Sequence, residues 1–395
     1  MQYDFDQIVD RSQNHAAKYD ERAKKFGTAD VIPLWIADMD FKTAQPIIDA
    51  LSARAQEGIW GYTARPDSYF EAIRSWQKRR HGWDIDPDLM SFSPGVVQSI
   101  SAMVKLFTPE GGSVLIQTPV YSEFYDMTEA WGRRVVESPF AERAGRWCVD
   151  WADFEAKLEQ SDLFLLCSPH NPLGIVWTPE ELERMARLCM KHHVVLFSDE
   201  IHSDLVFHGK RHTPVAALSP EIARFAVTGI SGTKTFNLAG LSFSDIIIRS
   251  HEERKRFIRR DKTHGAINPL SVAAHKAAYE QAGEWLDELK LYLDGNLKFV
   301  KDFISENIPT AVFQVPDATY FAWVDFRKTL PDVKDLSLFF ANNAGVLLEG
   351  GDALFVGNAE GFVRLNLAMP RALVKEGLER MAAAIERYSP GTDKK

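Results

Sequence analysis

Five apolar runs of strand length, separated by segments with helical periodicity, constrain the fold of this chain most strongly. The runs are "SVLIQTP" (113–119), "DLFLLCSP" (162–169), "VVLFSDE" (194–200), "RFAVTGIS" (224–231) and "SDIIIRS" (244–250). They are nearly continuous in apolar residues rather than alternating, which is typical of strands covered by helices on both faces. The pattern predicts an α/β chain, folded as a three-layer sandwich around a mostly parallel sheet.

The helical segments and the C-terminal third complete the predicted organisation. A helix is expected over 179–192, after the capping sequence "TPEE". From about Gly283 the pattern changes to longer helices and separate strands such as "YFAWVDF" (320–326), which predicts a smaller C-terminal α+β domain. We therefore expect an N-terminal arm associated with the small domain (1–45), a large domain (46–282) and the small domain (283–395).

Composition excludes several classes of protein. The 395 residues have a net charge of −9, which argues against a nucleic-acid partner, because such proteins concentrate positive charge for phosphate contacts. We expect a cytoplasmic protein with no membrane contact, since neither a signal-peptide pattern nor a run of about 18 apolar residues occurs. Cys148, Cys167 and Cys189 have no C-x-x-C spacing, so neither a disulfide framework nor a metal site is predicted. Cys167 is expected to be buried in a strand.

Polar residues follow three successive candidate strands. Asn171 comes after "DLFLLCSP", Asp199 ends "VVLF-SD", and Lys234 comes after "RFAVTGIS". Ligands of open α/β sheets bind beyond the carboxyl ends of the strands. Each residue alone has a structural explanation, because Asn-Pro favours turns, Ser-Asp caps helices and lysines populate loops. Their coincidence at one edge of the sheet predicts a site there.

Lys234 is the residue in this set with the most specific chemistry. A nucleotide-binding P-loop requires the lysine directly after a glycine, but Thr233 lies between Gly232 and Lys234. A penicillin-recognising serine enzyme would use Ser231 in S-x-x-K, yet its partner motifs S-D-N and K-T-G do not occur in the chain. A lysine that forms a Schiff base with pyridoxal phosphate remains, beside the alternative of an ordinary surface lysine.

The chemistry of pyridoxal phosphate needs the three groups found here. A buried aspartate such as Asp199 keeps the ring nitrogen protonated, and Lys234 supplies the imine and then a general base. Asn171 is suited to donate to the phenolate oxygen. The phosphate requires backbone N–H groups at a helix start, and "SPGVVQSI" (93–100) is expected to open a helix, with Gly95 permitting close approach. The amides of Val96 and Val97 come next.

Several motifs together resemble one enzyme family over nearly the whole chain. "SPHNPLG", "SDEIH" and "SGTKTFNLAGL" stand in the order and spacing of the aspartate aminotransferase superfamily of fold type I pyridoxal-phosphate enzymes. "PLWIADMDF", "GYTARPDSY" and "VRLNLAMPR" are most similar to its MalY/PatB-type cystathionine β-lyase branch of carbon–sulfur lyases. The resemblance implies that domain 46–282 binds the cofactor.

The resemblance assigns roles to matched residues. Lys234, Asp199 and Tyr121 would be catalytic, with the ring of Tyr121 stacked on the pyridine; the alternative is a tyrosine packed in the core. Arg364 would bind the substrate α-carboxylate with its bidentate fork, helped by Ala37 and Asn171. The expected cofactor-binding residues are Lys234, Asp199, Asn171, Tyr121, Gly95, Val96, Val97, His202, Ser231 and Tyr62.

Two positions depart from the wider superfamily. The phosphate-binding arginine of typical aminotransferases is replaced by Ser242, so Ser231 and the partner subunit's Tyr62 would contribute more to the phosphate site. The usual Asp-x-x-Tyr is Asp199 to His202, and His202 either bonds the phenolate oxygen or caps the following segment. The lyase branch shares both departures, which strengthens the narrower resemblance.

The resemblance implies a homodimer that eliminates thiols from sulfur amino acids. L-Cystathionine or a related S-substituted L-cysteine would give pyruvate, ammonia and a thiol, which is homocysteine in the case of cystathionine. The alternative is a class I/II aminotransferase. A non-catalytic regulator that retains the fold is a further class, although intact Lys234, Asp199 and Arg364 favour catalysis. A serine hydrolase using Ser231 is disfavoured by the missing motifs.

Overall fold

The computed structural model describes residues 2–11, 13–26, 30–143, 146–260 and 265–388. The chain divides into two compact units. Unit 1 consists of Met1–Lys42, Pro172–Gly174 and Asp287–Lys395, and unit 2 consists of Thr43–Asn171 and Ile175–Leu286.

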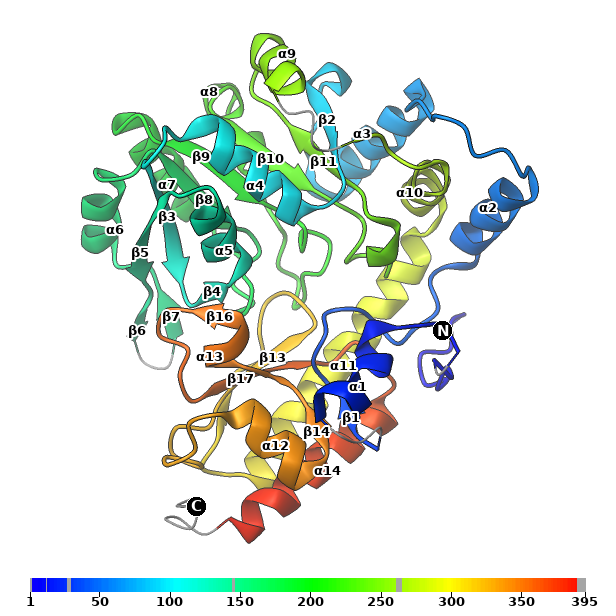
Figure 1. Cartoon of the computed structure of the whole chain (residues 1–395), viewed down its shortest axis with the longest axis vertical. Helices are drawn as coiled ribbons and strands as arrows, with labels where there is room; N and C mark the ends of the chain where they lie inside the picture. Colours follow the sequence, from blue (N-terminus) through cyan, green and yellow to red (C-terminus); the bar gives the residue numbers. More distant parts are fainter. Residues whose placement is uncertain (1, 12, 27–29, 144–145, 261–264, 389–395) are drawn as a thin grey trace. The chain divides into compact units, whose positions relative to one another are not determined.

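Unit 2 is built on a seven-stranded sheet with the order β2-β11-β10-β9-β8-β3-β5 (Figure 1). All neighbouring pairs are parallel except those of β11, which is antiparallel to both β10 and β2. The strands are β2 (Met90–Ser93), β3 (Ser113–Thr118), β5 (Arg134–Pro139), β8 (Leu163–Cys167), β9 (Val195–Asp199), β10 (Ala226–Ile230) and β11 (Ser244–Ile247). The five predicted strands are thus all present, and Cys167 is buried in β8 as expected.

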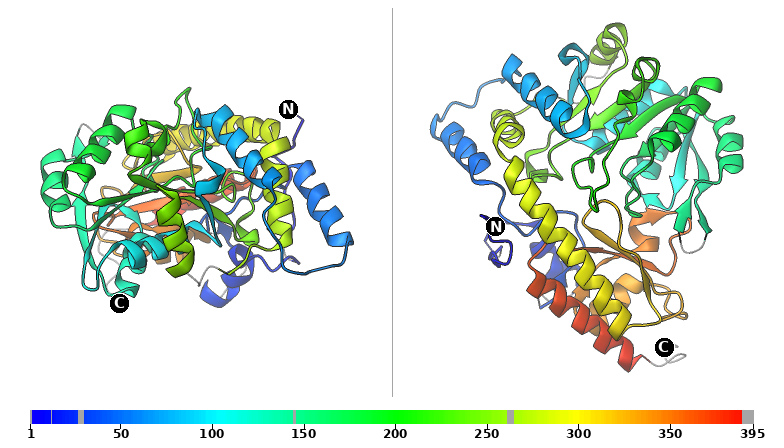
Figure 2. Two further views of the ribbon diagram at one scale, coloured as in Figure 1. Left: turned by 90° about the horizontal axis from the view of Figure 1, so that it is seen from above. Right: turned by 180° about the vertical axis from the view of Figure 1, so that it is seen from behind.

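Helices cover both faces of this sheet, with α4 and α5 against one face and α6 and α7 against the other (Figures 1 and 2). The predicted α/β sandwich is therefore confirmed. The helices of unit 2 are α2 (Gln45–Gln56), α3 (Asp67–His81), α4 (Val96–Phe107), α5 (Glu123–Ala130), α6 (Trp151–Leu158), α7 (Pro179–Lys191), α8 (Pro220–Ala223), α9 (His251–Arg260) and α10 (Pro269–Gln281). Its shorter elements are η1 (Pro87–Leu89), η2 (Val215–Ala217), η3 (Ala239–Leu241), β4 (Val120–Tyr121), β6 (Ala141–Arg143) and β7 (Arg146–Cys148).

The start of α7 shows how local sequence fixes an element boundary. The Thr178 hydroxyl accepts a hydrogen bond from the Glu181 amide at 3.2 Å, and the Glu181 carboxylate accepts one from the Thr178 amide at 2.9 Å. This reciprocal capping box satisfies two amides that the helix itself cannot pair. The helix predicted from "TPEE" begins accordingly at Pro179.

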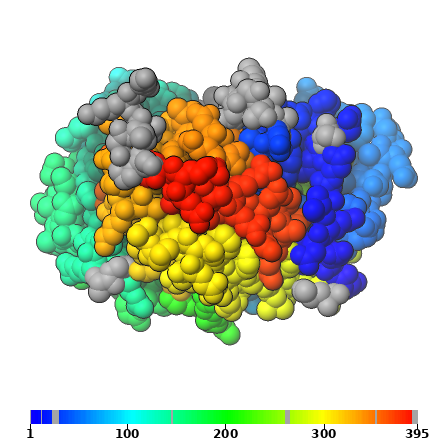
Figure 3. Space-filling view, turned by 90° about the horizontal axis from the view of Figure 1, so that it is seen from below, coloured from blue at the N-terminus to red at the C-terminus, as the bar shows by residue number. Residues whose placement is uncertain are grey.

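Unit 1 contains a four-stranded antiparallel sheet with the order β12-β13-β17-β15. Helix α14 lies beside α11, as Figure 3 shows in red and yellow, and the Arg371 side chain of α14 donates to Asn296 of α11 at 2.9 Å. The elements are α1 (Ala17–Phe26), β1 (Ile32–Pro33), α11 (Gly283–Asn307, which starts in unit 2), β12 (Val312–Phe313), β13 (Phe321–Asp325), α12 (Leu336–Ala344), β14 (Val346–Leu347), β15 (Glu349–Gly350), α13 (Gly351–Leu354), β16 (Phe355–Val356), β17 (Phe362–Asn366) and α14 (Arg371–Arg387).

The described ranges contain neither a membrane-spanning helix nor a metal-binding cluster. Among the helices that the structure describes, none combines the length and apolarity needed to cross a bilayer. Within the same part of the chain, no group of three or more His, Cys, Asp or Glu side chains is placed to hold a metal ion.

Candidate active site

Three neighbouring parallel strands bring the central predicted residues to one edge of the sheet in unit 2. Strand β9 lies between β8 and β10, with Asp199 in register with Cys167 on one side and Gly229 on the other. The chain segments that leave the carboxyl ends of β8 and β10 carry Asn171 and Lys234. The amide, the carboxylate and the amine therefore follow adjacent strand ends, as the sequence predicts.

Asp199 is a buried acid with little compensation for its charge. Burial raises its pKa to about 7, the nearby charge of Glu200 adds to this effect, and the amide of Ile201 and the charge of Lys234 oppose it. The Ile201 amide donates to Oδ1 of Asp199 at 3.1 Å. A carboxyl group in this state has a strong electrostatic preference for a cation placed beside it.

The residues around Asp199 are held by the segment that follows β9. Glu200 accepts hydrogen bonds from the Ser198 hydroxyl and the Val215 amide, both at 3.0 Å, and lies 2.8 Å from Nε2 of His212. His202 is buried on the same segment. After β8, the backbone amide of Asn171 donates to Sγ of Cys167 at 3.3 Å, which fixes the start of the Asn171 turn.

Hydrogen bonds of the Ser231 and Thr233 hydroxyl groups stabilise the turn before Lys234. The Ser231 hydroxyl donates to the carbonyl of Phe243 at 2.7 Å and lies 2.8 Å from the Thr233 hydroxyl. The Thr233 amide donates to the Ser231 oxygen at 3.1 Å. Gly232 has no room for a side chain without a shift, because a Cβ atom there would lie 3.2 Å from the ring of Phe236.

A helix start brings several backbone amides together in the same unit. Helix α4 begins at Val96, and Gly95 at its N-cap has no side chain with which to cap the first amides. A Cβ atom on Gly95 would lie 2.6 Å from Oε1 of Gln98. The amides of Val96 and Val97 belong to the first turn, where an anion is favoured by the helix dipole.

The two predicted tyrosines differ in exposure. Tyr121 is half-buried at the end of β4, directly before α5. Tyr62 is fully exposed in this single chain, as are large parts of Ile59 and Trp60 in the same segment. Three exposed bulky side chains within four residues form a surface that a monomer would not ordinarily leave in water.

An ion pair to a buried aspartate, which sequence reasoning missed, fixes the segment that follows Tyr62. Arg65 lies 2.8 Å from Asp245 of β11, and the Tyr69 hydroxyl donates to the other oxygen of Asp245 at 2.8 Å. Burial raises the pKa of Asp245, against the opposing effect of Arg65. Near this strand, Ser242 is exposed and has a left-handed backbone with φ of 50°.

Unit 1 carries the predicted carboxylate-binding arginine on β17. Arg364 is only 2% exposed, its Nη2 donates to the carbonyl of Trp35 at 3.3 Å, and its guanidinium lies 4.2 Å from the ring centroid of Phe321. The ring and the carbonyl orient the guanidinium plane, which matters for a group that binds carboxylates through two parallel N–H bonds.

The backbone around Ala37 is held by two side chains that sequence reasoning did not assign. The Tyr320 hydroxyl donates to the Ala37 carbonyl at 3.1 Å. The side-chain amide of Asn366 donates to the carbonyls of Ile36 and Asp38, at 2.6 and 2.7 Å. The available signal was a polar group in each apolar run, Tyr320 at the start of "YFAWVDF" and Asn366 within "VRLNL", because such a group needs a partner when buried.

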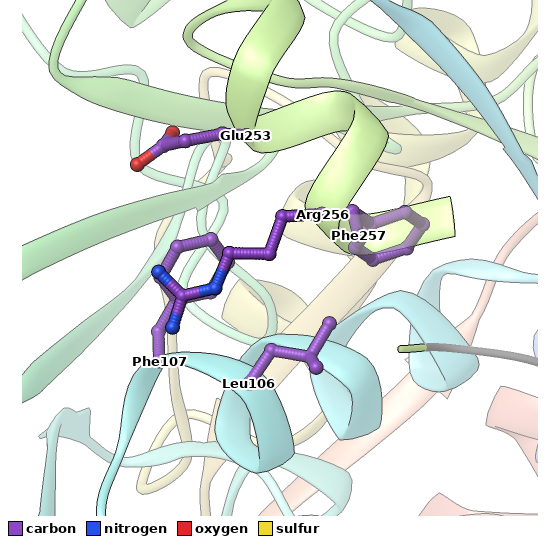
Figure 4. A pocket seen from close by; sticks show the side chains of 5 residues that line it. All are labelled: Leu106, Phe107, Glu253, Arg256 and Phe257. Carbon is purple, nitrogen blue, oxygen red and sulfur yellow. The ribbon is translucent and has the colours of Figure 1, made fainter. Parts of the chain in front are cut away.

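Unit 2 also contains a pocket whose lining differs from the residues described above. It is located between the C-terminal end of α4 and helix α9, and Figure 4 shows its side chains, with Arg256 directed toward the ring of Phe107. Its lining residues are Leu106, Phe107, Glu253, Arg256 and Phe257. None of the predicted site residues lines it.

Comparison with known proteins decides the family. The model of the family described as aminotransferase class I and II matches residues 29–381. The chain belongs to this family. Among its members, the chain is 39% identical to cystathionine beta-lyase PatB of Bacillus subtilis (strain 168), over 96% of this chain and 99% of that protein. It is 35% identical to protein MalY of Escherichia coli (strain K12), over 97% and 99%.

A solved structure in the same family has the same fold. The PLP-bound C-S lyase from Staphylococcus hominis superposes with a TM-score of 0.92 at 36% identity, over 98% of this chain and 99% of that one. The resemblance to the lyase branch of the aminotransferase class I and II family, first seen in short motifs, therefore extends over nearly the whole chain.

Proposed function

We propose that this chain is a pyridoxal-phosphate-dependent carbon–sulfur β-lyase that converts L-cystathionine or a related S-substituted L-cysteine into pyruvate, ammonia and a thiol. The observation that carries the proposal is the 39% identity to a cystathionine beta-lyase over 96% of the chain, with Lys234, Asp199 and Asn171 at or after the ends of three adjacent strands. Family membership alone leaves amino-group transfer as the second candidate.

The environment of Asp199 is compatible with a bound pyridoxal phosphate. A buried carboxyl whose pKa is raised to about 7 gains a counter-charge when a pyridinium nitrogen lies beside it. Pyridoxal phosphate, when bound, supplies an electron sink for the charge left at Cα. Asp199 keeps that sink effective by favouring the protonated ring nitrogen. Asn171 would donate to the phenolate oxygen, and His202 is the second candidate donor there.

The phosphate group would be bound mainly by uncharged donors. The first amides of α4, those of Val96 and Val97, are oriented for an anion, and Gly95 leaves the approach open. Ser231 is proposed to contribute from the turn before Lys234. The exposed position of Tyr62 supports a homodimer in which this tyrosine reaches the phosphate of the partner subunit.

Lys234 would move the proton in the reaction, and Tyr121 would help to hold the cofactor. Lys234 would hold the cofactor through its side-chain amine, and the same amine would accept the Cα proton of the substrate. Tyr121 would hold the cofactor ring through an aromatic contact. Arg364 would bind the α-carboxylate bidentately, with the backbone at Ala37 as a second contact.

Two reactions compete once the Cα proton has been removed: elimination of a thiol and transfer of the amino group. Elimination is favoured when the thiolate leaves Cβ faster than a proton is added back. A thiolate is a good leaving group, and Arg364 would fix the substrate in one orientation through its carboxylate. The cytoplasmic location and the choice among sulfur amino acids stay predictions.

The test is to supply cystathionine or cystine without any keto acid. We expect pyruvate, measured with lactate dehydrogenase, together with equal ammonia and a thiol or persulfide. The protein should also have a visible absorbance that borohydride bleaches. A strict requirement for 2-oxoglutarate, with no ammonia formed, would overturn the lyase proposal in favour of an aminotransferase.

A further inference from the structure

A buried carboxylate lies next to the turn that carries Lys234. Thr235, the residue after Lys234, is fully buried, and its hydroxyl donates to Oδ2 of Asp204 at 3.0 Å. Asp204 lies on the segment that follows β9, two residues after His202. The bond therefore joins the segment after β9 to the segment after β10 within unit 2.

Asp204 is held on its other side by helix α3. Nε2 of His81 lies 2.8 Å from Oδ1 of Asp204, and Nε1 of Trp76 donates to the same oxygen at 3.0 Å. Burial acts to raise the pKa of Asp204, but the hydrogen bonds from His81, Trp76 and Thr235 lower it below its usual value. Asp204 is therefore an acceptor-only carboxylate with three donors, and His81 must be a donor at Nε2.

The indole that binds Asp204 is itself fixed by packing. Trp76 is buried, stacks on Tyr279 at 5.3 Å with an angle of 27°, and meets Phe236 edge-on at 5.5 Å. The Arg80 guanidinium lies 4.8 Å from its centroid. Phe236 directly follows Thr235, so the same aromatic group also packs against the turn. The carboxylate thus has little freedom to move.

We propose that Asp204 is a positioning residue for Lys234, acting through the hydroxyl of Thr235. The inference rests on the proposed role of Lys234 as the cofactor lysine. Asp204 would fix the backbone at residue 235, so that the neighbouring amine occupies one place both when it binds the cofactor and when it accepts the Cα proton. A displacement of about 1 Å of such a group is enough to lower a rate about a hundredfold.

The test compares two threonines on the same stretch of chain. Thr235→Val removes the hydroxyl and keeps the shape of the side chain, whereas Thr235→Ser keeps the hydroxyl. Thr228→Val is the matched control, since Thr228 is buried in β10 and its hydroxyl has no hydrogen-bond partner among the described residues. Each purified protein is stripped of cofactor and titrated with pyridoxal phosphate, and kcat and KM are then measured.

We expect Thr235→Val to weaken cofactor binding about tenfold or more, the usual effect of losing a hydrogen bond to a charged group. Its kcat should fall by a similar factor, while KM for the amino acid changes less than about twofold, because substrate binding is left intact. Thr235→Ser should restore both properties. Thr228→Val should behave as the wild type.

Equal cofactor affinity and kcat in Thr235→Val and Thr228→Val would overturn the proposal, whatever happens to the melting temperature. If Thr235→Val does not fold, Thr235→Ala, which removes the same hydroxyl group, provides the comparison, and wild-type affinity and kcat in that variant would equally overturn the proposal. A different result would show that the proposed function itself is wrong. In that case borohydride treatment of the wild type would attach no cofactor to the peptide that contains Lys234.

Discussion

Nζ of Lys18 lies 2.8 Å from Oδ2 of Asp40 in a pair that is almost completely removed from water. Arg11 lies 2.5 Å from the other oxygen of Asp40 and 2.9 Å from Asp38. These charges connect the N-terminal part of unit 1 to the segment that contains Ala37. Charges at this depth are stable only when each has its partner.

Lys18→Met should therefore be strongly destabilising. The substitution leaves part of the Asp40 charge buried without its partner, and the loss of one member of a buried pair ordinarily costs about 3–5 kcal/mol. The free energy of unfolding in urea measures the effect. The double variant Lys18→Met/Asp40→Asn should recover part of the loss, since it removes the orphaned charge. Additive losses in the double variant would contradict this account of the pair.

Arg364→Lys should impair substrate binding more than folding. Lysine keeps the positive charge but loses the planar fork, so we expect KM for the amino acid to rise about tenfold or more with a smaller change in kcat. Arg327→Lys is the matched control, because Arg327 also lies over an aromatic ring, that of Phe362, but is half exposed. An unchanged KM in Arg364→Lys would exclude the proposed carboxylate contact.

The sheet was predictable from sequence except at its two edges. Central strands such as β8 and β9 are covered on both faces and consist of continuous apolar runs. The edge strands β2, "MSFS", and β5, "RVVESP", were not predicted. Both mix polar and apolar residues. Strand β5 is only partly covered, and β2 is largely buried but has two serines among its four residues. A short mixed run cannot be told from a loop by its periodicity.

The site residues at the ends of strands could be predicted from the sequence. The residues whose contacts join distant segments of the chain could not. Asp199 and Lys234 could be placed because parallel strands end at a common edge. The bond from Trp76 to Asp204 joins residues 128 positions apart. Nothing local distinguishes such an aspartate from a helix cap or a surface carboxylate, so its role emerges only from the folded structure.

Asp199→Asn should change the pH dependence of stability in the cofactor-free protein. The folded pKa of about 7 exceeds the ordinary value of 3.8, so the stabilisation that protonated Asp199 provides is complete below pH 4 and is lost as the pH rises to 7. The maximum loss is about 4 kcal/mol. Relative to wild type, Asp199→Asn should gain stability between pH 4 and 7, while Asp49→Asn, an exposed control on α2, should not. Parallel pH profiles of wild type and Asp199→Asn would contradict the raised pKa.

Lys234→Ala should abolish turnover without unfolding the protein. The lysine supplies both the covalent attachment and the proton-carrying amine, so its loss removes the chemistry rather than the packing. We expect activity below about 0.1% of wild type, an unchanged far-ultraviolet circular dichroism spectrum, and cofactor that borohydride no longer fixes to the protein. Recovery of a substantial fraction of wild-type activity would remove Lys234 from its proposed role.

Tyr62 can be assigned to its own or the partner's site by mixing two inactive variants. If Tyr62 serves the partner subunit, a heterodimer of Lys234→Ala and Tyr62→Ala chains contains one site with both substitutions and one site with neither. Random pairing then makes half of the dimers mixed, and about a quarter of all sites should be fully active. The measurement is turnover after co-refolding of the two chains in equal amounts, with dimerisation checked by size-exclusion chromatography.

The opposite arrangement gives a different result from the same mixture. If Tyr62 serves its own subunit, every site in the heterodimer carries one substitution, and the activity of the mixture equals the mean of the two parent homodimers. The exposed Ile59 and Trp60 beside Tyr62 favour the shared arrangement, because burial of these side chains against a second copy would bring the tyrosine to the interface. We therefore expect the mixture to exceed the mean of its parents and to approach a quarter of wild-type activity.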